Sequence, residues 1–262
     1  MQGFNYQTPA SVADAVKAAA AADAKIVAGG QSLIAAMKLG LAAPSALVDL
    51  GGIAALTGIT VSGNTVTIGA MTTHAAVAAS KEVAKAIPAL AQLAGGIGDR
   101  QVRNRGTLGG SLANNDPAAC YPAAVLGLGA TIKTDRREIA ADAFFKGLYE
   151  TALQDGEVIT SVSFPVPQKA GWQKFKQPAS RFSIVGVFVA RTASGVRVAV
   201  TGAGPGVFRA KALEDKLASD FSAKACDGVK IDASGLNNDL HGTAAYRAAL
   251  IPVLAGRAVA AS

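Results

Sequence analysis

Two glycine-centred segments, about eighty residues apart, constrain the fold of this chain more than any other feature. The first is Lys25-Ile26-Val27-Ala28-Gly29-Gly30-Gln31-Ser32-Leu33; the second is Arg105-Gly106-Thr107-Leu108-Gly109-Gly110-Ser111-Leu112, continuing into Ala113-Asn114-Asn115-Asp116-Pro117. Each places adjacent glycines beside hydroxyl or amide side chains. Because glycine lets the main chain approach a phosphate and adopt positive φ, backbone N–H groups in such a segment can close on an anion. One segment would be weak evidence, but two, each beside a predicted strand, indicate a diphosphate held from both sides.

The length and apolar content indicate a globular protein. A chain of 262 residues has room for two modest domains, each with its own core. Half of the residues are hydrophobic, yet the apolar runs fall far short of the roughly 20 residues that a membrane span needs. The start of the chain, Met1-Gln2-Gly3-Phe4-Asn5-Tyr6, lacks the basic and apolar regions of a signal peptide. We therefore expect a soluble cytoplasmic protein without a membrane span.

The cysteine and charge patterns argue against two other classes of site. Cys120 and Cys226 form no C-x-x-C pair, and His74 and His241 are the only histidines, so we expect neither a metal site nor an iron–sulfur cluster on this chain. The formal net charge is +7, but the basic residues are scattered and not interleaved with aromatic residues. This pattern favours an acidic protein partner or an anionic ligand over nucleic acid.

Hydrophobic periodicity and turn residues predict the order of the elements. Helices are expected at 12–19, 33–39, 73–79, 81–93 (interrupted by Pro88), 118–128, 210–218 and 243–260, and strands at 25–28, 46–49, 130–134, 158–164, 172–175, 184–190 and 196–201, with a hairpin at 59–68. The segment 95–110 is expected to be a glycine-rich connection.

The best domain boundary is marked by Pro165-Val166-Pro167 and the polar run to Gly171. The strands followed by helices beyond this boundary predict a small α+β domain.

The two glycine segments, with three later ones, resemble the FAD-binding medium subunit of the molybdenum hydroxylases, the family of carbon monoxide dehydrogenase, xanthine dehydrogenase and aldehyde oxidase. The matching segments are Ala28-Gly29-Gly30-Gln31-Ser32-Leu33, 101–110 (QVRNRGTLGG), Asp116-Pro117-Ala118-Ala119, 175–181 (FKQPASR) and 241–247 (HGTAAYR). Any one of them could arise by chance, but all five in order make a specific match over nearly the whole chain.

The resemblance implies an α+β fold. Two α/β subdomains, about 1–58 and 59–170, would form a PCMH-type FAD-binding domain over residues 1–170. Residues 171–262 would form a small C-terminal flavoprotein domain with a three-stranded antiparallel sheet and helices. The predicted order of strands and helices agrees with this arrangement.

The resemblance also implies which residues bind FAD. The matching positions are Lys25, Ile26, Val27, Ala28, Gly29, Gly30, Gln31, Ser32, Leu33, Ile97, Gly106, Thr107, Gly109, Gly110, Asn114, Asp116, Cys120, Val158, Ile159 and Lys176. Residues 28–32 would donate to the diphosphate, with Gly106, Thr107 and Gly110 closing from the other side. Ile97, Val158 and Ile159 would lie along the flavin. Lys176 would lie near its polar edge, where a positive charge stabilises the reduced, anionic flavin.

Two positions depart from the family pattern. Gln31 stands where many relatives carry histidine, although the backbone role of the segment survives that change. Cys120 stands where many carry an aspartate expected to bind the ribityl or adenosine side of FAD, with Asp116 nearby. For Cys120, a small buried thiol is favoured over a covalent flavin link.

Other polar residues have open interpretations. Arg100, Arg103 and Arg105 are consistent with phosphate binding and equally with packing or subunit contacts. We expect structural roles for His74 and His241. Tyr246-Arg247 is expected to anchor the terminal helix rather than bind a ligand.

The function implied by the resemblance is electron transfer. FAD on this chain would accept electrons from [2Fe-2S] clusters of a small partner subunit and pass them to a terminal acceptor, while substrate is hydroxylated at the molybdopterin cofactor of a large subunit. The complex would be a dimer of heterotrimers, and this chain would carry no catalytic residue. Two alternatives stay open: a self-contained FAD-dependent oxidoreductase with its own small substrate, and a basic scaffold or nucleic-acid-binding protein.

Overall fold

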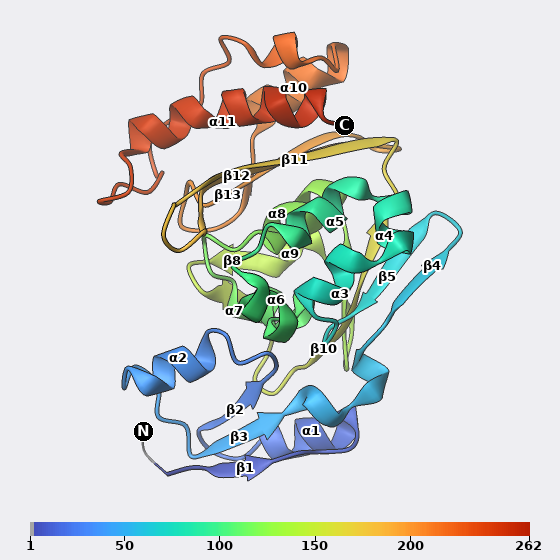
Figure 1. Ribbon diagram of the computed structural model, residues 1–262, viewed down its shortest axis with the longest axis vertical. Coiled ribbons are helices and arrows are strands. Elements are labelled where there is room, and N and C mark those ends of the chain that lie inside the picture. Colours follow the sequence, from blue (N-terminus) through green and yellow to red (C-terminus); the bar gives the residue numbers. More distant parts are fainter. Residues whose placement is uncertain (1–2) are drawn as a thin grey trace.

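The computed structural model describes residues 3–262, which form three stacked units that follow one another along the chain (Figure 1). Met1 and Gln2, which begin the segment lacking signal-peptide features, lie outside the described residues. The N-terminal unit lies at one end of the long axis, and the C-terminal helices lie at the other. From residue 3 to residue 262, no helix combines the length and the apolar character that crossing a membrane requires.

The N-terminal unit is a small parallel α/β layer. Its elements are β1 (Asn5–Gln7), α1 (Val12–Ala19), β2 (Ala24–Val27), α2 (Leu33–Lys38), β3 (Ala46–Asp49) and the short 3-10 turns η1 (Leu50–Gly52) and η2 (Ala54–Leu56), with strand order β1-β3-β2. The Ser11 hydroxyl caps α1 by accepting from the amide of Asp14 at 3.1 Å. The buried Ala15 then packs with Val48 and Leu50. A second small cluster of Val27, Met37 and Leu47 also holds the unit, which presents its β2–α2 connection to the next unit.

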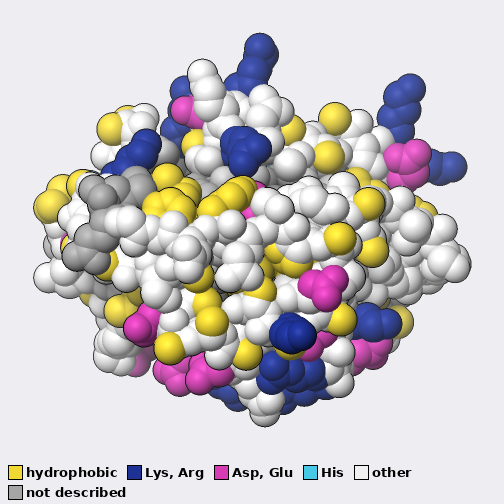
Figure 2. All heavy atoms as spheres, turned by 90° about the horizontal axis from the view of Figure 1, so that it is seen from below, with side chains coloured by type: hydrophobic (Ala, Val, Ile, Leu, Met, Phe, Trp, Pro, Cys, Tyr) yellow, Lys and Arg dark blue, Asp and Glu magenta, His cyan; other side chains and the backbone are white. Residues whose placement is uncertain are grey.

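The lower face of the molecule, toward which the N-terminal unit lies, has no single sign of charge (Figure 2). Acidic and basic side chains are both present on it, with hydrophobic side chains scattered between them. Such a mixed face does not create the large single-sign field that steers nucleic acid.

The middle unit is an antiparallel sheet covered by helices. The sheet has the order β4 (Ile59–Ser62), β5 (Thr65–Gly69), β10 (Ile159–Pro165), β6 (Thr131–Thr134) and β7 (Glu138–Ala140). The helices are α3 (His74–Ala79), α4 (Lys81–Ala86), α5 (Pro88–Gly95), α6 (Arg100–Arg105), α7 (Leu108–Asn114), α8 (Tyr121–Leu128) and α9 (Ala141–Phe144), followed by the small hairpin β8 (Phe145–Gly147) and β9 (Glu150–Thr151).

The segment 95–110 differs from its predicted form. Instead of a glycine-rich connection it contains α6 and the start of α7, each with a side-chain cap: Asp99 accepts from Val102 N at 2.8 Å and Thr107 accepts from Gly110 N at 3.2 Å. The glycines are tolerated in α7 because the helix packs closely. A Cβ on Gly109 would stand 2.6 Å from the Cβ of Ala70.

The C-terminal unit is a sheet with both faces covered. Its strands are β11 (Lys169–Lys176), β12 (Ser183–Thr192), β13 (Gly195–Thr201) and β14 (Phe208–Arg209), and its helices are α10 (Lys211–Ser219), the 3-10 turn η3 (Ala223–Cys226) and α11 (Ala244–Ala260). α11 lies on one face, and α5 and α8 lie on the other (Figure 1). The three-stranded prediction is wrong by one strand, because β14 has two residues and is too short to show alternation.

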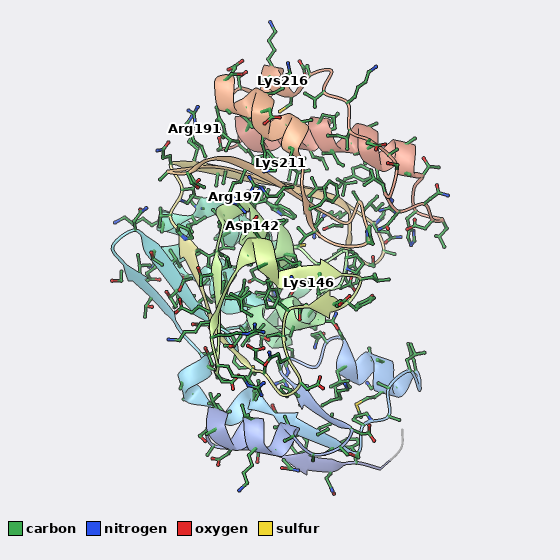
Figure 3. The ribbon with its side chains drawn as sticks, turned by 180° about the vertical axis from the view of Figure 1, so that it is seen from behind. Asp142, Lys146, Arg191, Arg197, Lys211 and Lys216 are labelled. Carbon is green, nitrogen blue, oxygen red and sulfur yellow. The ribbon has the colours of Figure 1, made fainter. Side chains whose placement is uncertain are left out.

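The C-terminal sheet shares its inner face with the middle unit. Trp172, Phe188 and Ala199 belong to the same buried cluster as the apolar face of α8. On the back of the molecule, Arg197 of β13 donates to both carboxylate oxygens of Asp142, at 2.7 and 2.8 Å, and joins the two units at their surface (Figure 3). The two units therefore behave as one packed body around the site.

Candidate functional site

A cavity of about 600 Å³ lies where the three units meet. Its wall is built from the β2–α2 connection, from the second glycine segment, from residues 116–120, and from the β11–β12 connection of the C-terminal sheet. Every sequence-predicted cofactor residue lies in this wall except Lys176. The chain thus brings segments far apart in sequence together around one elongated cleft.

The first glycine segment presents unpaired main-chain donors. It leaves strand β2 after the buried Val27, turns at Gly30 with φ +73°, and enters α2 at Leu33. Within residues 3–262, the amides of residues 28–32 donate no hydrogen bond to the protein. The Ser32 side chain makes no capping bond either. Successive free N–H groups at a helix start form a concave anion-binding surface.

The second glycine segment, unlike the first, has main-chain donors that are already hydrogen-bonded to the protein. The amides of Leu108 and Gly109 already donate to Thr72 O at 3.1 Å and Ala70 O at 2.8 Å, and that of Gly110 donates to Thr107 Oγ1. These three main-chain donors are therefore committed to the protein. The segment shapes the opposite wall, and a Cβ on Gly110 would stand 3.3 Å from the Cβ of Ala28 across the cleft.

Apolar side chains and a cationic side chain line further parts of the cavity. Ile97, Val158 and Ile159 line it, with Ile159 at the start of β10. The Lys174 ammonium group donates to Gly96 O at 2.7 Å and to Arg181 O at 3.0 Å. Lys174 thereby joins the β11–β12 connection to the α5–α6 connection in the cavity wall.

The sequence-predicted Lys176 does not line the cavity, and Lys174 stands there in its place. In a regular strand, residues two apart share a face. The pairing of β11 with β12 shifts register between Phe175 and Lys176, so the two lysines do not share one face. The lysine that lines the cavity therefore lies two positions before the one that the sequence pattern predicts beside the flavin.

The segment after α7 closes the side of the cavity. The Asp116 carboxylate accepts from Ala118 N at 2.8 Å and from the Tyr149 hydroxyl at 3.3 Å. Cys120 is 5% exposed, with its sulfur 3.5 Å from the Lys174 nitrogen and 3.6 Å from Ser183 Oγ. The structure therefore places a buried thiol beside an ammonium group at this position.

The sequence prediction missed residues that reach the cavity only through tertiary packing. They are Leu50, Ala70, Met71, His74, Gly98, Val102, Ser111, Ala113, Ala118, Ala119, Tyr149, Leu153, Glu157, Lys174, Ser180, Arg181 and Phe182. Several of them lie within segments already singled out from the sequence, so their position along the chain was a usable signal: Val102, Ser111, Ala113, Ala118, Ala119, Ser180 and Arg181. For His74 and Phe182 no local pattern pointed to a cofactor wall.

His74 is a neutral group in the wall. It is 5% exposed, and burial, with the nearby Arg103 charge, lowers its pKa to about 4. Its Nδ1 atom has no hydrogen-bond partner among the described residues, and its ring lies 5.3 Å from that of Tyr121. His74 therefore borders the cleft without adding charge at neutral pH.

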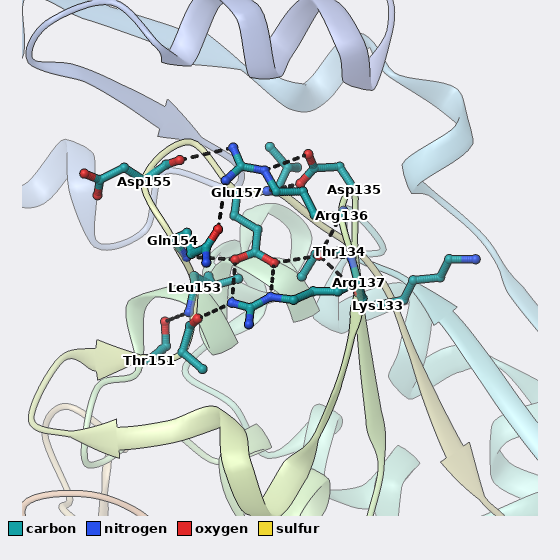
Figure 4. A network of polar contacts seen from close by, with 12 residues as sticks. Lys133, Thr134, Asp135, Arg136, Arg137, Thr151, Leu153, Gln154, Asp155 and Glu157 are labelled. Carbon is teal, nitrogen blue, oxygen red and sulfur yellow. Dashed lines mark hydrogen bonds and ion pairs between the residues drawn. The ribbon is translucent and has the colours of Figure 1, made fainter.

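Glu157 is a charged group held by a network at the cavity edge (Figure 4). Hydrogen bonding to the Arg137 guanidinium, with further bonds from Gln154 N and Thr134 Oγ1, lowers its pKa to about 2 despite burial of the carboxylate. The Arg137 Nε–Oε1 distance is 2.9 Å. Glu157 is ionised and fully bonded, so it fixes the segment that leads through Val158 into β10.

Potential metal ligands do not cluster. Between residues 3 and 262, no group of three or more His, Cys, Asp or Glu side chains could hold a metal ion. Cys120 and Cys226 are both buried free thiols.

Comparison with known proteins gives one consistent family. The model of the FAD binding domain in molybdopterin dehydrogenase matches residues 2–167. The chain is 36% identical to the nicotine 6-hydroxylase medium subunit of Paenarthrobacter nicotinovorans, over 99% of this chain and 97% of that one. It is 35% identical to the carbon monoxide dehydrogenase medium chain of Hydrogenophaga pseudoflava, over 99% and 96%.

Solved structures agree along the whole chain. The Cu,Mo-CO dehydrogenase structure superposes with a TM-score of 0.90 at 33% identity, covering 99% of this chain and 98% of that one. Quinoline 2-oxidoreductase from Pseudomonas putida 86 superposes with a TM-score of 0.88 at 31% identity, covering 99% and 96%.

Proposed function

Because this chain belongs to the FAD-binding medium subunits of the molybdenum hydroxylases, we propose that its cleft holds FAD with the diphosphate on the first glycine segment and the flavin at the apolar end. The observation that carries this placement is the run of unpaired amides at residues 28–32. The flavin then lies against Ile97, Val158 and Ile159, with Lys174 at its edge.

The cavity matches the chemical parts of FAD. Its volume of about 600 Å³ lies within the range of cofactor sites. Free N–H groups suit the diphosphate, an apolar wall suits the flavin face, and the hydroxyl and amide side chains of Ser111 and Asn114 suit the ribityl chain. Bound FAD accepts electrons singly and releases them in pairs. The contribution of this chain is to bind FAD, to orient it and to set the charge around it.

The chain is one subunit of an oxidoreductase complex. Its relatives are named as medium chains or subunits of dehydrogenases and hydroxylases, which favours an electron relay over a self-contained oxidoreductase. Electrons arrive from iron–sulfur clusters of a small subunit, after substrate has reacted at the molybdopterin cofactor of a large subunit, and leave FAD for a terminal acceptor. We propose a dimer of such heterotrimers as the assembly.

Two finer assignments accompany this proposal. The FAD-binding domain extends over residues 1–170, in subdomains of about 1–58 and 59–170, and the C-terminal flavoprotein domain over 171–262. The compartment is the cytoplasm, and the two buried free thiols, Cys120 and Cys226, suit its reducing conditions.

Purification from the native organism tests the proposal. A complex containing this chain should carry one FAD per chain and co-purify with molybdenum and iron. A lone chain that is yellow and oxidises a small substrate without partners would overturn the relay in favour of the self-contained enzyme. A lone chain that stays colourless when FAD is added would overturn the placement of the cofactor.

A further inference from the structure

The FAD-lining segment 116–119 is a partition between two cavities. Asp116 and Ala118 line both the large cleft and a second cavity of about 300 Å³ on its other side, toward the C-terminal helix α11. A segment with empty space behind it gains little support from side-chain packing on that side. Its position therefore depends on the few hydrogen bonds that hold its main chain.

Those bonds come from the C-terminal sheet. Pro117 O accepts from Gly202 N at 2.8 Å and from the buried Thr201 hydroxyl at 3.0 Å, and the same hydroxyl lies 2.7 Å from Ala119 O. Gly202 has φ +82°, and a Cβ there would stand 2.9 Å from Ile184 O. The turn after β13 is thus a close-packed clamp on the partition.

Arg247 of α11 fixes this clamp from behind. Its side chain is buried, at 3% exposure, and every donor is used. Nη1 donates to Ile184 O at 2.8 Å and to Gly202 O at 3.0 Å, and Nη2 donates to both Asp239 carboxylate oxygens at 2.7 and 2.8 Å. Nε donates to Gly242 O at 3.3 Å. The Gly202 residue is held through its carbonyl by Arg247, while its amide holds Pro117.

We propose that Arg247 is a positioning residue for the FAD cleft, which couples the packing of the C-terminal helix to cofactor affinity through Gly202 and Pro117. The inference rests on the proposed FAD site. Arg247 touches no part of the cleft itself. Without the forked guanidinium of Arg247, the Gly202 carbonyl is no longer held. The segment 116–119 can then move into the second cavity behind it.

The test compares FAD affinity and amide exchange in full-length variants. Arg247→Lys keeps one charge but cannot reach Ile184 O, Gly202 O and Asp239 together. We expect FAD to bind about tenfold more weakly, as for one lost positioning hydrogen bond. The amides of Ala118 and Ala119 should exchange faster than in wild type, with or without FAD. Arg257→Lys, on the exposed face of the same helix, is the matched control and should leave both unchanged.

A second variant covers poor folding of the first. Thr201→Val removes the hydroxyl held by Pro117 and Ala119 while Arg247 stays in place. It should also weaken FAD binding. The double variant should lose less affinity than the sum of the two single losses, because both side chains hold the Pro117 carbonyl, Thr201 directly and Arg247 through Gly202. Folded variants with wild-type FAD affinity and exchange rates would overturn the inference. A wild-type chain that fails to bind FAD overturns the proposed function instead, and the exchange rates then still decide whether Arg247 positions the partition.

Discussion

The α-carbon of Gly29 lies directly against the carbonyl group of Arg105, so the two glycine segments touch each other through their main chains. A Cβ on Gly29 would overlap that carbonyl and would stand 2.7 Å from the α-carbon of Gly106. The two walls of the cleft therefore meet at this point, which is possible because Gly29 has no side chain. The glycine at position 29 permits this close approach of the two segments.

This contact makes Gly29 sensitive to the smallest substitution. In Gly29→Ala, the added methyl group must push the N-terminal unit away from α6. We expect about 1–3 kcal/mol of lost stability, as for overpacking elsewhere, and loss of bound FAD. Urea unfolding and the flavin-to-protein absorbance ratio measure the two effects.

The matched control is Gly95→Ala at the exposed end of α5, where the new Cβ meets only Ala78 at 3.7 Å. It should retain FAD and be no less stable, since alanine favours a helix over glycine. If Gly29→Ala retains FAD as well as Gly95→Ala does, the two walls are not joined as the structure implies.

The lowered pKa of Glu157 predicts that the protein loses stability in strong acid. Its pKa is lowered to about 2, chiefly by hydrogen bonding to Arg137, against an unfolded value of about 4.5. Its contribution to stability is therefore fully present above about pH 4.5 and is lost as the pH falls toward 2. Glu157→Gln should cost about 1–3 kcal/mol at pH 7 and flatten this part of the profile.

Urea unfolding from pH 7 to 3 measures the change. Asp155→Asn, an exposed carboxylate two residues away, is the control and should leave the profile as in wild type. An unaltered acid profile in Glu157→Gln would show that the network does not hold the segment that leads into β10.

The lowered pKa of His74 predicts a second fall in stability with acid, at a higher pH than that of Glu157. Burial, with the charge of Arg103, lowers its pKa to about 4, while an unfolded histidine titrates near 6.5. The unfolded chain therefore takes up a proton first, and the free energy of unfolding falls as the pH drops from about 6.5 to 4, by on the order of 3 kcal/mol. His74→Gln should remove this dependence, whereas His241→Gln, at an exposed histidine, should keep it.

The sequence predicted the cavity wall best where the residues that line it are contiguous. The segment 25–33 could be assigned because one strand-to-helix connection carries all of its donors. The helix α1 could be placed from its Ser11 cap and apolar spacing, and β12 from its apolar run, which is buried almost end to end between two layers of helices.

Other parts of the structure leave no local trace. α6 buries none of its residues and so shows no apolar period, and α7 contains two glycines that argue against a helix. His74 and Phe182 reach the cleft only because distant elements pack together. The register shift after Phe175 follows from strand pairing, and residue types alone do not locate it.

That register shift separates two lysines with different predicted effects on the flavin. Lys174 lies in the cavity wall, whereas Lys176 does not. A nearby positive charge stabilises the reduced, anionic flavin, so Lys174→Gln should lower the midpoint potential of bound FAD. A shift of about 30 mV, a tenfold change in the two-electron equilibrium, is the expected scale. Lys176→Gln is the matched control, with the same charge removed two residues away, and should leave the potential unchanged. Spectroelectrochemical titration of both variants decides the assignment, because the opposite order would return the flavin to the lysine that the sequence pattern predicted.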